Sequence, residues 1–368
     1  MAMQKESSAS RTSPPAGREP MREEVIYNCH VHIFNHENVP DDFLFPYSIP
    51  LVRNKYMRWV LRKIIKGINS LPIIPKERQQ RYGAFIEAAY RDRQEGNLKN
   101  VMGYYPKGTK FVILPMDMAL MQRGTVLEDI DEQHAELARL YRDSRYRDVL
   151  IPFAHIDPRR PDSLARLKTL VERDGFKGVK IYPALGYPPA HEILMDEIYP
   201  YMVENNLPLM SHCSHGPVYT REYTKKVAHA FSDPCNYIKV MESFPRLKIC
   251  LAHFGGSGEW EKQLDAPRNV DSQTWVAKIV ELLKDERYPN LYTDISYTIF
   301  TVSENVPYLN TLLQNTKICE KVLFGSDFYM AECESFSEKR LSIYLRTVLG
   351  EDVFWTIANE NPQKYLFH

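Results

Sequence analysis

The chain has 368 residues, of which 44% are apolar and 26% are charged, a balance typical of globular proteins that bury a large core. Lys plus Arg and Asp plus Glu both total 47, so no basic excess indicates nucleic-acid binding, and we expect a small-molecule substrate instead. No apolar run approaches the roughly 20 residues that span a bilayer, so no membrane partner is expected, while a homo-oligomer remains compatible with the composition.

The N-terminal segment is rich in Ser, Pro and charge and has little to bury, which predicts a flexible tail over 1–22 before a folded domain over 23–368. The six cysteines show no short paired spacing, and no segment resembles a secretory signal. These features predict reduced thiols and a cytoplasmic protein.

Eight apolar segments that end in polar residues recur along the rest of the chain. They are 25–34, 110–117, 148–158, 175–183, 207–213, 247–254, 290–297 and 321–327. Runs that are apolar on both faces are typical of parallel strands covered by helices. Between them, 127–143 and 161–175 have the spacing of amphipathic helices. This alternation predicts an α/β fold, a (β/α)8 TIM barrel.

Two of the connections are too long for simple crossovers. The first, over about 35–110, has helical periodicity in 54–71 and 77–97, which predicts an inserted helical cap after the first strand. The second, over about 213–246, predicts one or two extra helices. Both leave the barrel at the end where active sites of this fold lie.

The first strand segment contains His30 and His32 within an apolar run. Residues two apart on a strand project to the same side, so the two imidazoles can meet one ion. The same alternation predicts that Cys29, Val31 and Ile33 face the covering helices.

Polar side chains close three later strands at the equivalent place. His212 ends the fifth strand segment, His253 the sixth and Asp327 the eighth. Carboxyl ends of barrel strands meet at one mouth, so these side chains should approach the first pair. Histidines with a carboxylate suit Zn²⁺, while Mn²⁺ and Fe²⁺ are alternatives.

With these motifs, the sequence resembles the amidohydrolase superfamily, and within it the amidohydrolase 2 branch that includes carboxymuconate-semialdehyde decarboxylase-like enzymes. The resemblance covers about residues 25–367. It is carried by HVH at 30–32, GFKGVKIYP at 175–183, SHC at 211–213, AHFGG at 252–256, LFGSDF at 323–328 and ANENPQKYLF at 358–367. It implies that one divalent metal ion is bound by His30, His32, His212 and Asp327. It also implies that His253 acts on the substrate or on the metal's water.

General chemistry adds roles to these residues. A catalytic Zn²⁺ keeps one position for water and lowers the pKa of that water to about 7. Asp327 could both contact the metal and accept the proton of the water. His253 could orient the water or protonate a leaving group. The alternative for His253 is a strand-end histidine that only bonds a backbone carbonyl.

Three further residues are candidates for substrate binding. Lys180 lies at the end of the fourth strand, where two-metal members of the superfamily carry a carboxylated lysine. We favour a cation near the substrate, with a bridging carbamate and a plain ion pair as alternatives. Tyr182 and His215 are predicted to contact the substrate, against the alternatives of core packing and a solvated loop.

The sequence therefore predicts a metal-dependent hydrolase that uses metal-activated water on a small amide, lactone or related carbonyl compound. The alternative is a non-oxidative decarboxylase of an aromatic or unsaturated carboxylic acid. The metal ligands do not separate these reactions, because both use the same residues. A third hypothesis is a catalytically inactive barrel that only binds.

Overall fold

The computed structural model describes residues 24–43, 48–68, 87–88, 91–265, 273–298, 305–328, 330 and 337–368. The tail predicted over 1–22 lies outside the described residues, as does most of the helix predicted over 77–97. None of the helices in the described ranges is long and apolar enough to cross a membrane.

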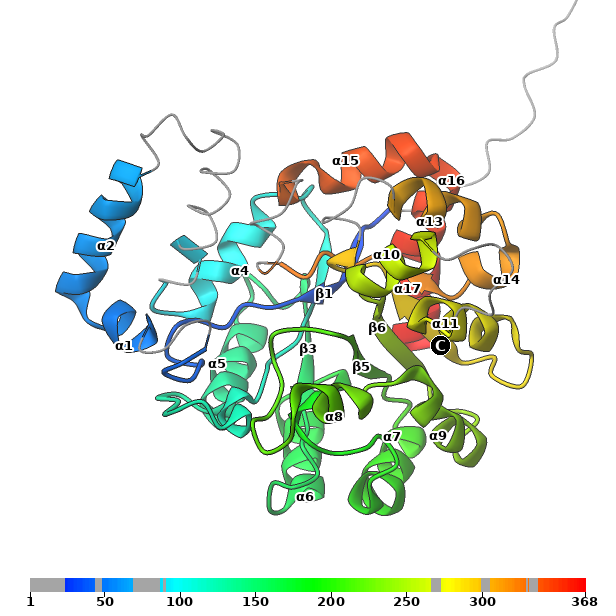
Figure 1. Ribbon diagram of the computed structural model, residues 1–368, viewed down its shortest axis with the longest axis horizontal. Coiled ribbons are helices and arrows are strands. Elements are labelled where there is room, and N and C mark those ends of the chain that lie inside the picture. The colour runs from blue at the N-terminus through cyan, green and yellow to red at the C-terminus, as the bar shows by residue number, and fades with distance from the viewer. Residues whose placement is uncertain are drawn as a thin grey trace, which may run out of the picture.

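Eight strands form one sheet at the centre of the molecule, in the order in which they occur in the chain (Figure 1). They are β1 (Tyr27–Val31), β2 (Lys110–Ile113), β3 (Leu150–His155), β4 (Gly178–Ile181), β5 (Leu209–Ser214), β6 (Ile249–Gly255), β7 (Leu291–Asp294) and β8 (Val322–Leu323). Every neighbouring pair is parallel.

The chain around β8 returns to β1 and nearly closes the sheet. The backbone N–H of Cys29 donates to the carbonyl of Phe324 at 2.8 Å, and the N–H of Asp327 donates to the carbonyl of His30 at 2.9 Å. A parallel bridge also joins Val31 to Phe328. The predicted (β/α)8 barrel is therefore confirmed.

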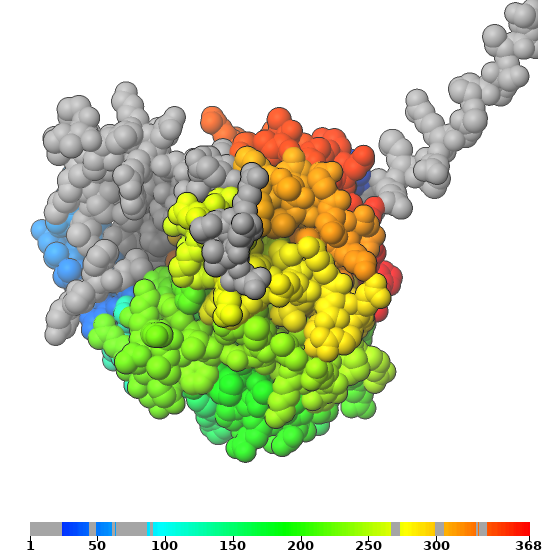
Figure 2. Space-filling view, turned by 45° about the vertical axis from the view of Figure 1, so that its right-hand side comes forward, coloured from blue at the N-terminus to red at the C-terminus, as the bar shows by residue number. Residues whose placement is uncertain are grey.

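Helices alternate with the strands and surround the barrel (Figure 1). They are α1 (Ser48–Arg53), α2 (Lys55–Ile68), α4 (Gln94–Met102), α5 (Ile130–Arg142), α6 (Ser163–Lys168), α7 (Tyr199–Glu204), α8 (Lys225–Ala230), α9 (Ile238–Ser243), α10 (Ser257–Asp265), α11 (Trp275–Lys284), α13 (Asn305–Leu313), α14 (Thr316–Cys319), α15 (Glu338–Leu349), α16 (Glu351–Trp355) and α17 (Asn361–Phe367). Helices α1, α2 and α4 precede β2. In Figure 2 the green, yellow, orange and red segments follow one another around the surface, as expected for units added in chain order.

The strand side chains divide into an outer and an inner layer. On β2, Phe111 and Ile113 belong to the large apolar cluster that includes Leu137 of α5. Val112 and Leu114, the residue after β2, belong to a separate cluster made mostly of strand residues. The first cluster is the layer between sheet and helices, and the second fills the barrel interior. This layering leaves the carboxyl ends of the strands to carry polar groups.

Strand β1 departs from the regular alternation. Its pairing with β2 shifts register between Asn28 and Val31. Cys29 joins Val112 in the barrel interior, whereas Val31 and Ile33 join the outer layer. The prediction that Cys29 faces the covering helices is therefore wrong, because an irregularity in pairing changes which side a residue faces.

Candidate metal centre

Two histidines from the end of β1 present lone pairs to the same point in the barrel mouth. Nδ1 of His30 lies 2.8 Å from Oδ2 of Asp294, and Nδ1 of His32 lies 2.7 Å from the carbonyl oxygen of Leu114. Carbonyl and carboxylate oxygens only accept, so both Nδ1 atoms carry the proton and both Nε2 atoms keep a lone pair. Burial, and then the charge of Lys180, lower the pKa of His30 well below 6.5, so its ring stays neutral.

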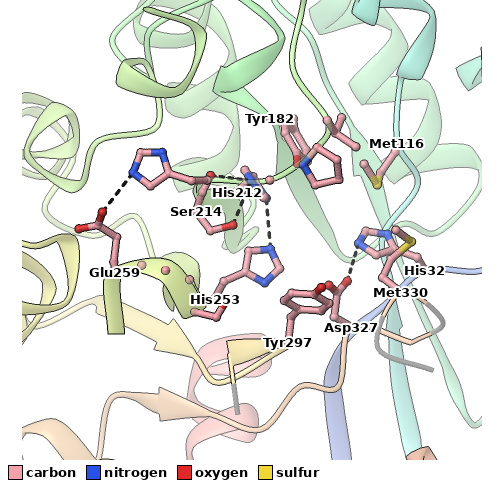
Figure 3. Close-up of a pocket in the computed structure, with 18 of the residues that line it drawn as sticks. His32, Met116, Tyr182, His212, Ser214, His253, Glu259, Tyr297, Asp327 and Met330 are labelled. Atoms are coloured by element: carbon pink, nitrogen blue, oxygen red, sulfur yellow. Dashed lines mark hydrogen bonds and ion pairs between the residues drawn. The ribbon is translucent and has the colours of Figure 1, made fainter. Parts of the chain in front are cut away.

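Asp327 brings a carboxylate to these lone pairs (Figure 3). Its Oδ1 lies 3.2 Å from Nε2 of His32 and 3.8 Å from Nε2 of His30. Within the described residues, neither this oxygen nor Nε2 of His30 has a hydrogen-bond partner, and both side chains are buried. Facing acceptors without a donor are unfavourable unless a cation lies between them. The three ligand atoms lie within 4.8 Å of one another, so these residues fit a divalent metal ion.

His212 and His253 face each other at the ends of β5 and β6 (Figure 3). Nε2 of His253 lies 3.1 Å from Nδ1 of His212, whose own Nε2 lies 3.0 Å from the carbonyl oxygen of Ser214. Burial, and then the charge of His30, lower the pKa of His253 to about 3. Burial also lowers the pKa of His212 well below its usual value, so both rings are neutral. His212, predicted to be a ligand, thus lies beside His253 and outside the three-residue ligand group.

Two buried residues that the sequence reasoning did not select, Asp294 and Ser296, join the histidines. The Ser296 hydroxyl lies 2.9 Å from Nδ1 of His253 and 3.2 Å from Nδ1 of His30. Asp294 accepts hydrogen bonds from the backbone N–H of His253 at 2.9 Å and of Ser296 at 3.0 Å. A signal was available, because Asp294 is a carboxylate at the carboxyl end of its strand, as Asp327 is.

Lys180 is fully buried in β4. Its Nζ has no hydrogen-bond partner within the described residues. Burial lowers its pKa to about 8, although the nearby charges of Asp294 and Asp327 raise it. Lys180 is not among the residues that line the cavity described next. The structure therefore brings this residue to the carboxylates of the centre without bringing it to the substrate-facing surface.

A cavity of about 480 Å³ opens beside the ligand group, a volume suited to a small molecule. His32, His212, His253 and Asp327 line it together with apolar side chains that include Phe34, Phe43, Met116, Val218 and Met330. Tyr182 also lines the cavity, and its ring stacks on His212 with centroids 3.9 Å apart. Burial, and then the charge of Asp327, raise the pKa of Tyr182 well above 10, so its hydroxyl stays protonated.

His215 lines the cavity and contacts Glu259, which lies on the side away from Asp327 (Figure 3). Its Nδ1 lies 3.1 Å from Nδ1 of His229, whose Nε2 lies 3.1 Å from the carbonyl oxygen of Gly216. His229 must donate to that carbonyl, so its Nδ1 accepts from His215. The other ring nitrogen of His215 lies 3.4 Å from Oε1 of Glu259. Both ring nitrogens of His215 therefore face acceptors.

Glu259, which also lines the cavity, has hydrogen-bond partners that stabilise its charged form. Burial raises its pKa, but hydrogen bonds from His215, Lys262 and the backbone of Trp275 outweigh burial and hold the pKa of Glu259 at about 2. Lys225, the first residue of α8, lines the cavity as well. No hydrogen bond or ion pair of Lys225 occurs in the part of the chain that the structure describes. The wall of the cavity therefore carries a cation that is free to meet an anion.

The chain matches the model of a known protein family. The family model described as Amidohydrolase matches residues 27–367. Comparison with curated proteins gave no match. The solved structure of 4-oxalomesaconate hydratase from Rhodopseudomonas palustris is 19% identical, covers 93% of this chain and 95% of its own, and has a TM-score of 0.51.

Two decarboxylase structures are similar as well. The 5-carboxyvanillate decarboxylase from Sphingomonas paucimobilis is 12% identical, with 94% of this chain and 99% of that chain covered and a TM-score of 0.53. The enzyme of that name from Novosphingobium aromaticivorans, solved with manganese and 4-hydroxy-3-methoxy-5-nitrobenzoic acid, is 16% identical, with 94% and 97% covered and a TM-score of 0.52. At these identities the likeness shows a shared fold.

Proposed function

This chain belongs to the amidohydrolase family and is an enzyme of that superfamily, and from this premise we propose that it is a metal-dependent hydrolase of a small amide, lactone or related carbonyl compound. The observation that carries the proposal is the group of buried acceptors on His30, His32 and Asp327, which lacks a donor and fits one divalent cation. Zn²⁺ is the ion we propose, and Mn²⁺ or Fe²⁺ would fit the same donors.

A divalent ion held by these residues would supply a water of lowered pKa and polarise the substrate carbonyl. Asp327 is the proton acceptor we propose, because its carboxylate lies in the ligand group and also lines the cavity. His253, whose pKa burial lowers to about 3, is a weak base, so it orients the reacting groups through Nε2. Tyr182 keeps its hydroxyl proton and donates a hydrogen bond to the substrate oxygen.

A second candidate, non-oxidative decarboxylation of an aromatic or unsaturated acid, is favoured by one observation. Lys225 lines the cavity, and a carboxylate is the substrate group that this cation attracts. The apolar walls would accept a ring. Both candidates take a small molecule as the partner.

The test is a screen of the metal-loaded protein in ¹⁸O-enriched water against lactones and amides, and in parallel against aromatic acids with CO₂ detection. Hydrolysis predicts that ¹⁸O from water enters the carboxyl product. CO₂ release without ¹⁸O incorporation would contradict hydrolysis and support the second candidate. Uptake of less than about a tenth of an equivalent of metal under replete conditions would contradict both enzymatic proposals.

A further inference from the structure

Asp294 is the buried carboxylate that connects His30 of the ligand group to His253. It ends β7, and its side chain is fully buried. Oδ2 contacts the ring of His30, and Oδ1 contacts the backbone at His253. We propose that Asp294 is a positioning residue that fixes the tautomer of His30 and the backbone of His253 and does not itself bind an ion. This inference rests on the proposed metal-dependent function.

The contact to Oδ2 decides which nitrogen of His30 is available. Nδ1 of His30 lies 2.8 Å from Oδ2, and an ionised carboxylate can only accept, so the proton is on Nδ1. Nε2 then points its lone pair toward Asp327. A carboxylate that holds a histidine in this way also makes the ring a better ligand. Asp294 therefore prepares His30 for a metal without contacting the metal.

The contacts to Oδ1 hold a strained backbone. This oxygen accepts from the N–H of His253 at 2.9 Å, from the N–H of Ser296 at 3.0 Å and from the Ser296 hydroxyl. His253 and Phe254 have φ values of 69° and 45°, in the left-handed region that side-chain-bearing residues rarely adopt. The hydrogen bond to Asp294 is thus made at the residue where β6 leaves regular geometry and turns the imidazole of His253 toward His212.

The same contacts decide whether Asp294 itself binds an ion. Among the described residues, two groups have the geometry to hold a metal, His30 with His32 and Asp327, and His30 with His253 and Asp294. In the second group both oxygens of Asp294 already accept from donors, and Nδ1 of His30 is one of those donors. A metal there would have to displace these protons. Only the first group has lone pairs without donors.

The experiment is the substitution Asp294→Asn. Three donors at Oδ1 would hold the amide oxygen in that place, so the amide NH₂ would face Nδ1 of His30. His30 would then have to accept at Nδ1 and carry its proton on Nε2, where no lone pair remains for a metal. We expect Zn²⁺ affinity, measured by competition with a chromophoric chelator, to fall by about 10- to 100-fold.

A second measurement locates the proton on the ring of His30 directly. In ¹⁵N-histidine-labelled wild-type apoprotein, NMR should show His30 protonated at Nδ1, and in Asp294→Asn it should show the proton at Nε2. Wild-type protein should bind one equivalent of Zn²⁺. Two tightly bound equivalents, an Nε2-protonated His30 in the wild type, or unchanged affinity in a folded Asp294→Asn variant would each overturn the proposal.

A control variant distinguishes positioning of His30 from a general loss of stability. Asp157→Asn alters another buried carboxylate, one paired with Arg159 at 2.8 Å and outside both groups that could hold a metal, and should bind metal normally. These readouts need no substrate. A failure to find turnover would therefore count against the proposed function without affecting this inference.

Discussion

Each histidine of the candidate metal centre has at least one ring nitrogen held by a fixed neighbour, and its chemistry depends on what the other nitrogen faces. His30 and His32 are held by a carboxylate and a carbonyl, so their remaining nitrogens are acceptors that can bind a cation. His253 contacts the ring of His212 on one side and the hydroxyl of Ser296 on the other. Substitutions of the metal ligands and of His253 should therefore have different effects on metal binding and on activity.

We expect His30→Ala and Asp327→Asn to lose metal and activity together, because each removes one of three converging acceptors. His253→Asn should retain metal and lose about 100-fold or more in kcat/KM, a loss typical of a removed acid, base or orienting group. Metal analysis of the purified variants and steady-state kinetics check both outcomes. Near wild-type kinetics in His253→Asn would remove its catalytic role.

Lys225 and Lys226 provide a matched pair for testing the cationic wall. Both are exposed residues at the start of α8, but only Lys225 lines the cavity. With benzoate as the probe and calorimetry on metal-loaded protein, Lys225→Gln should weaken binding by about 3- to 10-fold, since an exposed charge contributes about 1 kcal/mol. Lys226→Gln should have no effect. The difference should shrink at high salt because exposed charges are screened, and equal affinities at low salt would contradict a role for Lys225.

At the scale of elements, local sequence signals place the helices well. The spacing over 127–143 predicts the helix observed as α5, and the segment 161–175 forms α6 followed by a π-helical turn over Thr169–Arg173. Helix α5 begins with a capping box, in which Asp129 accepts from the N–H of Asp131 and Glu132 accepts from the N–H of Asp129. This reciprocal pair satisfies backbone donors that the first turn cannot.

Asp129→Ala should therefore lower the free energy of unfolding by about 1 kcal/mol, the usual effect of losing an N-cap side chain. Asp265→Ala is the control, because Asp265 is an exposed residue at the end of α10. Urea unfolding followed by circular dichroism measures both variants. Equal midpoints for Asp129→Ala and the wild type would show that the box contributes nothing to stability.

At the scale of the molecule, the packing of helices on the barrel buries histidines far from the metal centre. His134 of α5 accepts a hydrogen bond from the backbone N–H of His155 at 3.0 Å and packs against Phe176. Burial, and then the charge of His155, lower the pKa of His134 to about 3. In the unfolded chain this ring takes up a proton below pH 6.5, whereas in the folded protein it does not until about pH 3.

The unfolded state thus binds more protons in this window, so stability falls as the pH is lowered from about 6.5 toward 3. For His134 alone the loss between pH 7 and pH 5 is about 2 kcal/mol. His134→Gln, which can still accept from the N–H of His155, should show a smaller loss over that range in urea unfolding of metal-free protein. The same pH dependence in His134→Gln would contradict this account.

The sequence by itself determined the barrel, because apolar runs and the polar residues that end them are local features. All eight strands coincide with the expected segments, with β5 and β6 each ending one residue later, and His30, His32, His212, His253 and Asp327 all lie at the same end of the barrel. Which of them bind metal stays a prediction. The alternation rule failed at Cys29, because a shift in strand pairing cannot be read from one strand alone.

Only the tertiary structure decided the proton positions and the burial of the centre. Asp294 is connected to His30 across 264 residues of sequence, and it determines which nitrogen of that ring keeps a lone pair. Lys180 is fully buried and is not among the residues that line the cavity, so its contact with the substrate stays a prediction. The tautomer and pKa of a side chain and its access to the cavity depend on groups from distant segments. The pattern of a strand depends on neighbours in the chain. For that reason the sequence located the centre, and the fold set its chemistry.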